Sequence, residues 1–233
     1  MNALIFLIIS FLLLSPSVFS DDDPLKNINQ KTHSFNNSLD DQLASPIAKT
    51  YKSVTPDLLE LGFTNIFSNV EDINIGLNNI LQGKFKDGFS DIFRFTINSS
   101  IGLGGLFDVA SNLGLEKHDE DFGQTLAVWG VASGPYIMLP GLGPSTLRDT
   151  LSRPVSSFSS VTFHMTDTDT NIALKTIDAV ETRERLLDVE SLLSGDKYSF
   201  VKDAYIQSIN YEIKDGIDVE DDFVDDMDDF LID

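Results

Sequence analysis

The chain has 233 residues, of which 37 are acidic and 16 are basic, so its formal net charge is −21. This excess of acid argues against binding to nucleic acid or to an anionic membrane surface, because both need cationic side chains. The absence of cysteine excludes disulfides and thiolate chemistry, whereas 42% hydrophobic residues are enough for a folded core.

The first twenty residues have the pattern of an export signal. Positions 4–14 are almost all Leu, Ile and Phe, which is the length of a signal-peptide core and too short for a spanning helix. Small residues precede Asp21, so we expect cleavage after Ser20 and an exported mature chain. A retained N-terminal anchor is the alternative.

Apolar residues then recur at helical spacing through most of the chain. Asp23-Pro24 is expected to begin a helix that runs to about Ile47, and Thr55-Pro56 a second one that stops at Gly83. The same spacing continues over residues 85–98, 169–193 and 198–213, and no sustained period-two alternation occurs. The predicted fold class is therefore all-α.

Two of these predicted helices have clear faces. Phe85, Phe89 and Phe93 form an aromatic stripe at i, i+4 and i+8, which favours an amphipathic helix that could seat the protein in a membrane. In the helix after residue 169, the charged residues are expected to form the solvated face: Glu181, Arg183, Glu184 and Arg185.

Two long stretches carry no charge. Residues 95–107 contain three glycines, and residues 122–147 are long enough to cross a bilayer but contain eight Gly and Pro residues. A straight spanning helix cannot carry so many breakers, because hydrocarbon offers no replacement for lost backbone hydrogen bonds. Composition leaves two alternatives open for the second stretch: a re-entrant or interfacial wall of a pore, or a buried Gly/Pro-rich loop in a helical core.

The sequence offers no catalytic constellation, so we expect neither an enzyme nor a cofactor or metal site. The three histidines are isolated from one another and are expected to be exposed to solvent: His33, His118 and His164. The last sixteen residues hold nine acids and no base, which favours a disordered acidic tail.

Several motifs occur in a fixed order along the chain. They include Gly102-Leu-Gly-Gly-Leu-Phe-Asp-Val-Ala, Asp121-Phe-Gly-Gln-Thr-Leu, Gly130-Val-Ala-Ser-Gly-Pro-Tyr and Leu147-Arg-Asp. Flanking pieces such as Asp23-Pro-Leu and Glu181-Thr-Arg agree in order. Together they make the chain resemble the MlaA (VacJ) family from about Asp23 to Tyr205.

The resemblance implies a ring of amphipathic helices around a central polar channel, set in the inner leaflet of a Gram-negative outer membrane. Such proteins remove phospholipids that have strayed to the outer leaflet and pass them to a periplasmic carrier, which maintains lipid asymmetry. The implied partners are phospholipids, an outer-membrane porin and that carrier. The alternatives are a soluble periplasmic lipid carrier without a channel, a phospholipase and a purely structural porin-binding protein.

The resemblance also assigns roles to residues. Arg148 and Asp149 would be a structural pair at the edge of the second uncharged stretch, although they are expected to need separate partners because neighbours in a helix do not face each other. The expected divisions are residues 1–20 as signal peptide, 21–213 as helical domain and 214–233 as acidic tail. The lipoprotein cysteine of the family is missing, so attachment would rest on apolar surface. Lipid contact and channel construction fall to Ile101, Gly102, Gly104, Gly105, Phe107, Phe122, Gly123, Trp129, Gly134, Pro135, Tyr136 and Pro140.

Overall fold

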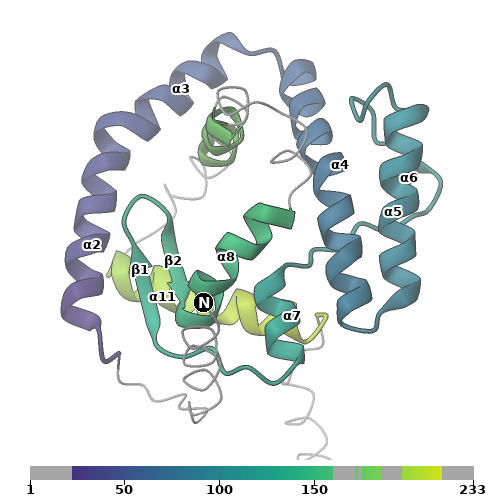
Figure 1. Cartoon of the computed structure of the whole chain (residues 1–233). Coiled ribbons are helices and arrows are strands. Elements are labelled where there is room, and N and C mark those ends of the chain that lie inside the picture. Colours follow the sequence, from purple (N-terminus) through teal and green to yellow (C-terminus); the bar gives the residue numbers. More distant parts are fainter. Residues whose placement is uncertain (1–22, 160–171, 173–174, 185–195, 217–233) are drawn as a thin grey trace, which may run out of the picture.

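The computed structural model describes residues 23–159, 172, 175–184 and 196–216, and its helices are arranged as a ring (Figure 1). The predicted signal peptide, nearly all of the acidic tail and His164 lie outside the described residues. The mostly helical fold class is confirmed. The elements of the ring are α2 (Lys26–Leu39), the π-helix η1 (Asp40–Ala44), α3 (Ser45–Val54), α4 (Asp57–Leu81), α7 (Phe122–Val128) and α11 (Lys197–Ile213).

The remaining elements lie inside or outside this ring (Figure 1). Helix α5 (Phe85–Ser100) packs along the outer side of α4 and is followed, after a loop, by the short α6 (Val109–Asn112). The hairpin β1 (Tyr136–Leu139) and β2 (Gly143–Thr146), helix α8 (Leu147–Ser159) and the helical residues 175–184 lie within the ring.

The helix boundaries follow the sequence signals closely. Helix α4 begins one residue after Pro56 and ends before Gly83, whose φ of +86° is the left-handed conformation expected after a helix end. Helix α2 begins at Lys26, and the Asp23 carboxylate accepts the backbone N–H of Leu25 at 3.0 Å. The predicted first helix continues beyond Ile47 to Val54, through the single turn of π-helix.

The hairpin is an element that the sequence did not predict. Each strand has four residues, and Tyr136 pairs with Thr146 while Leu139 pairs with Gly143. Helix α2 supports the hairpin through Asn29, which donates to the Tyr136 carbonyl at 3.0 Å and accepts the Met138 N–H at 2.9 Å. One asparagine thus satisfies two backbone groups at the outer edge of β1.

A charged cluster joins the end of α4 to the end of α11. The Lys84 ammonium, at the turn between α4 and α5, pairs with Glu120 at 2.7 Å and with Asp215 after the end of α11. Burial raises the pKa of Glu120, although the hydrogen bonds from Lys84 and Gln82 oppose that shift. The contact fastens the C-terminal end of α11 to α4.

Candidate functional site: an apolar outer face around a polar interior

The described residues reverse the usual distribution of polar and apolar side chains. Six apolar residues are buried against nineteen polar or charged ones, whereas large apolar residues are exposed on α2, α3, α4, α5, α7, α8 and α11. Proteins in water rarely expose so much apolar surface, and buried polar groups need partners. The arrangement suits a protein whose outer surroundings are themselves apolar.

Helix α5 shows this reversal most clearly. Phe85, Phe89 and Phe93 are 58%, 55% and 61% exposed, whereas Asp91 and Arg94 on the other face are 0% and 1% exposed. The sequence prediction of an amphipathic helix was right, and the aromatic stripe is the uncovered face. Its role in membrane seating stays a prediction.

The backbones of α4 and α5 approach closely where each helix carries a glycine. A Cβ on Gly88 would lie 2.7 Å from the Gly76 carbonyl oxygen, so no larger residue fits without moving a helix. This close contact leaves the polar side chains of both helices facing each other. Asn79 donates to Asp91 at 2.9 Å, and His118 contacts the other Asp91 oxygen at 2.8 Å.

Arg94 is the centre of the buried polar cluster. Its guanidinium lies 3.4 Å from Asp72 and 3.1 Å from Asp108, and it donates to the Leu115 carbonyl at 2.5 Å. Burial raises the pKa of Asp72 despite the nearby Lys117 and Arg94. For Asp108, burial is outweighed by hydrogen bonds from Ser111 and Asn98 and by the charge of Arg94, which lower its pKa to about 2.

This cluster holds the loop of residues 101–107 from within. A Cβ on Gly102 would lie 2.2 Å from the Phe107 carbonyl oxygen, and one on Gly105 would lie 2.7 Å from the Asn69 side chain. The loop therefore needs both glycines to fold back on α4 and α5. It leaves Ile101, Leu103 and Phe107 exposed, and Leu103 takes a φ of +56°, an uncommon conformation for a side chain of its size.

Residues 122–147 fold as α7, a turn, the hairpin and the start of α8, rather than as one straight helix. A Cβ on Gly123 would lie 2.6 Å from the Asp149 carboxylate, so α7 and α8 approach closely there. Tyr136 is buried and its ring packs against those of Tyr198 and Tyr205. Pro140 is exposed at the hairpin turn.

Arg148 and Asp149 form the pair that the resemblance implied, and the expectation that they need separate partners is wrong. The Arg148 Nε donates to Asp149 Oδ1 at 2.9 Å, although the two residues are adjacent. They stand at the first turn of α8, where the long arginine side chain can fold back on its neighbour. Asp149 also accepts hydrogen bonds from Thr146 at 2.6 Å and from Tyr205 at 2.8 Å.

The predicted solvated face of the helix at residues 175–184 is also wrong. Glu181 and Glu184 are 1% and 3% exposed, and Arg183 is partly buried. The Arg183 guanidinium forms two hydrogen bonds with the Asp40 carboxylate, at 2.5 and 2.6 Å. Glu184 pairs with Lys52, and Glu181 accepts from Thr64. The helix lies inside the ring, so its charged face meets η1, α3 and α4 instead of water (Figure 1). Arg185 lies outside the described residues.

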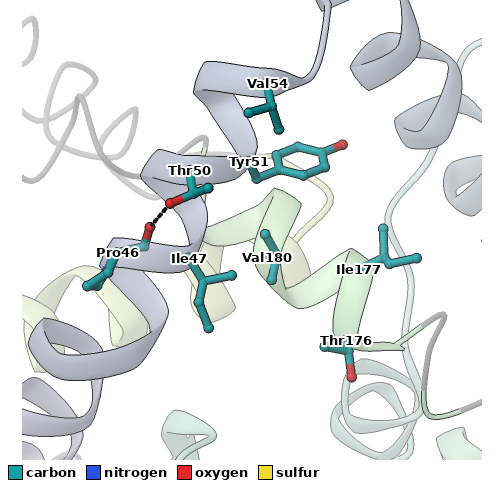
Figure 2. A pocket seen from close by; sticks show the side chains of 8 residues that line it. All are labelled: Pro46, Ile47, Thr50, Tyr51, Val54, Thr176, Ile177 and Val180. Atoms are coloured by element: carbon teal, nitrogen blue, oxygen red, sulfur yellow. Dashed lines mark hydrogen bonds between the residues drawn. The ribbon is translucent and has the colours of Figure 1, made fainter.

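Apolar residues of this helix and of α3 line a pocket of about 470 Å³ (Figure 2). Helix α3 contributes one continuous side of it, and residues 175–184 contribute the other. The lining is almost entirely apolar and includes Ile47, Thr50, Tyr51, Val54, Ile177 and Val180.

The residues predicted for lipid contact fall into two groups. Those of 101–107 contact α4 and α5, whereas Gly123, Gly134 and Tyr136 contact α8, α11 or the hairpin. Phe122 packs edge-on against Trp129, which is 55% exposed, and Pro135 accepts the Leu147 N–H. Gly104 is exposed with nothing within 4 Å of a Cβ. No prediction named the pocket, which depends on two helices far apart in the sequence.

Two expectations about the histidines are wrong. His118 is held by Asp91, and its side chain is 27% exposed. His33 is partly buried and packs edge-on against Tyr198. His33 lies on α2 and His118 in the segment between α6 and α7, and the residues that cover them are distant in the sequence, which spacing cannot reveal. Among the described residues no group of three His, Asp or Glu could hold a metal ion, and none of the helices there is long and apolar enough to cross a membrane.

Comparison with known proteins gives one consistent result. Residues 21–212 match the family described as MlaA lipoprotein. The chain is 35% identical over 191 residues to the intermembrane phospholipid transport system lipoprotein MlaA of Escherichia coli, covering 79% of this chain and 76% of that one. It is 32% identical over 186 residues to an uncharacterized protein of Rickettsia typhi, covering 78% and 74%.

A solved structure agrees with these relatives. It is described as "Structural basis for maintenance of bacterial outer membrane lipid asymmetry". It superposes with a TM-score of 0.74 at 33% identity, covering 82% of this chain and 99% of that one.

Proposed function

The chain belongs to the MlaA family, and on this premise we propose that it transports phospholipids between membranes and so maintains the lipid asymmetry of a Gram-negative outer membrane. It removes mislocalised phospholipids from the outer leaflet through a channel in the ring and passes them to a periplasmic carrier. The relatives named for phospholipid transport support the cargo. A porin is the proposed partner in the membrane.

One observation carries the proposal: the apolar side chains of the described helices face outward and the polar ones face inward. Leaving a large apolar side chain in water costs roughly 25 cal/mol per Å² of its surface, so the uncovered stripes favour a lipid environment. None of the described helices can span the bilayer, so a ring of amphipathic helices would lie within a single leaflet.

Polar groups inside the ring support the proposed channel. A phospholipid headgroup costs several kcal/mol or more to move through hydrocarbon, and a polar route lowers that cost. The hairpin and α8 lie inside the ring, and α8 carries polar side chains that are not fully buried: Thr150, Arg153, Ser156 and Ser157. We place the channel along these elements. Direction comes from the carrier, since a passive channel shifts no equilibrium.

The alternative is a soluble periplasmic carrier without a channel. Such a protein would turn its apolar residues toward its cargo and its polar residues toward water, which is the opposite of helix α5. Fractionation separates the two: the ring is recovered only with detergent, whereas a carrier appears in periplasmic washes.

We also propose that the exposed loop of residues 101–107 contacts lipid, and Gly104→Glu tests this role in a Gram-negative strain whose own MlaA-family protein has been deleted. Nothing lies within 4 Å of a Cβ there, so a charge can be placed without a clash. Gly104 has a φ of +74°, and Gly104→Asn is the control because asparagine tolerates that conformation. Gly134→Arg is a poorer test, since a Cβ on Gly134 would lie 2.9 Å from the Leu147 Cβ.

We expect cells with Gly104→Glu to show more surface-exposed phospholipid and greater detergent sensitivity than cells with Gly104→Asn. Equal values for the two variants, at equal protein levels, would contradict the proposed role of this loop.

A further inference from the structure

The pocket between α3 and residues 175–184 is not used by the proposed channel. Ile47, Tyr51 and Val54 line one side, and Ile177 and Val180 line the other (Figure 2). Its volume of about 470 Å³ is within the usual range for small-molecule sites, roughly 300–1,000 Å³.

The lining offers a ligand almost no polar partner. The Thr50 hydroxyl donates to the Pro46 carbonyl at 2.8 Å, and the Thr176 hydroxyl donates to the Ile172 carbonyl at 2.7 Å. Both threonines thus bond their own helices. Apart from the Tyr51 hydroxyl, the surface left to a ligand is carbon, so the occupant must be uncharged and apolar.

The charged residues beside the pocket are paired away from it. Lys52 pairs with Glu184, and Arg183 holds Asp40. These pairs fix residues 175–184 against η1 and α3, and none of their members lines the pocket. They hold both walls in place without adding charge to the site.

The pocket is open to its surroundings. Its lining residues Ile47 and Val54 are 51% and 71% exposed. A lipid chain that contacts these two side chains can therefore enter the pocket.

We infer that this pocket holds a hydrocarbon chain of a phospholipid while the headgroup follows the polar interior. The inference rests on the proposed function, because it assigns a site to the cargo named there. A single chain suits a small apolar pocket between two helices, and its separation from the headgroup removes the need for one passage to accept both.

The test is photocrosslinking of the purified full-length protein in detergent. The probe is phosphatidylcholine with a diazirine midway along one acyl chain, and free palmitic acid with the same group is the second arm. Adducts are located by mass spectrometry of peptides. We expect phospholipid adducts in residues 45–54 and 175–184, in addition to adducts on the exposed face of α5.

Ile177→Trp fills the pocket and is expected to lower adducts there by about fivefold or more, while adducts on α5 stay unchanged. Leu58→Trp is the matched control, because Leu58 is exposed and does not line the pocket. This variant is expected to change neither the adducts in the pocket nor those on α5.

Adducts on α5 without adducts in the pocket would overturn the inference and leave the proposed function intact. Pocket labelling by free palmitic acid but not by the phospholipid would overturn the assigned occupant. Absence of adducts from both surfaces would contradict the pocket and the proposed function together.

Discussion

Helix α5 and the helix at residues 175–184 both bury charged residues, but their apolar residues lie in different surroundings. The apolar face of α5 points away from the ring, with Phe85, Phe89 and Phe93 uncovered. The apolar residues of the inner helix, Ile177 and Val180, line a pocket with α3 instead.

The difference shows how this fold is held together. Buried ion pairs and hydrogen bonds, such as Arg94 with Asp72 and Arg183 with Asp40, join the helices. The apolar residues are then left for other contacts. Those of α5 lie on the outer surface, and those of the inner helix line the pocket. Burying an unpaired charge is costly, so removing one partner of such a contact is expected to destabilise the fold.

The largest expected effect is the loss of the charge at the centre of the α5 cluster. Arg94→Met removes the buried cation that lies between Asp72 and Asp108, which keep only Lys117, Asn98 and Ser111 as partners, and is expected to destabilise the protein by about 3–5 kcal/mol. Chemical unfolding in detergent measures this. Lys86→Met, on the exposed part of α5, is the control and should change stability by less than about 0.5 kcal/mol. Equal effects would show that the polar cluster does not hold α5.

The matching change in the inner helix is expected to have a smaller and local effect. Arg183→Met removes two charged hydrogen bonds to Asp40, which are partly exposed, so about 1.5–3 kcal/mol is at stake. Hydrogen exchange should quicken in residues 175–184 and not in α5. Lys175→Met, an exposed position on the same helix, is the control. Unchanged exchange in the inner helix would refute its anchoring by this pair.

The outer face is tested by membrane partition rather than by stability. Phe89→Ser removes a side chain that is 55% exposed and is expected to weaken binding to liposomes about fivefold, or ~1 kcal/mol. Ile177→Ser, which changes the pocket, should leave flotation with liposomes almost unchanged. If the two variants behave alike, the outward and inward apolar faces are not distinct.

The smallest expected effect is a pH dependence that comes from Asp108. Its pKa is lowered to about 2 in the folded protein, so it stabilises the fold above its unfolded pKa near 4, and that contribution is lost as pH falls toward 2. Asp108→Asn should flatten the unfolding curve in this interval. An equally steep acid transition in the variant would remove Asp108 as its source.

The sequence predicted helices better than it predicted their faces. The spacing of Phe85, Phe89 and Phe93 and the stop at Gly83 were enough to locate α4 and α5. Spacing shows that a helix has two faces, but it cannot show which one is buried when the surroundings are apolar. Glu181 and Arg183 were therefore expected in solvent.

Long-range partners account for what the sequence missed. The hairpin has strands of only four residues, too short for a period-two pattern, and its support comes from Asn29, more than a hundred positions away. The pocket joins Ile47 to Ile177 in the same way. The motifs at residues 101–107 and 122–140 identified the family, although the structure separates them into two groups.

The central claim is that the outer apolar face of the ring lies in lipid. The chain has no cysteine, so Phe89→Cys on α5 and Glu116→Cys in the charged, exposed segment before α7 each accept one spin label. In liposomes, oxygen concentrates in hydrocarbon and a nickel chelate stays in water. The account predicts that a label at position 89 collides mainly with oxygen and a label at position 116 mainly with the chelate. Equal access of the chelate to both positions would contradict it.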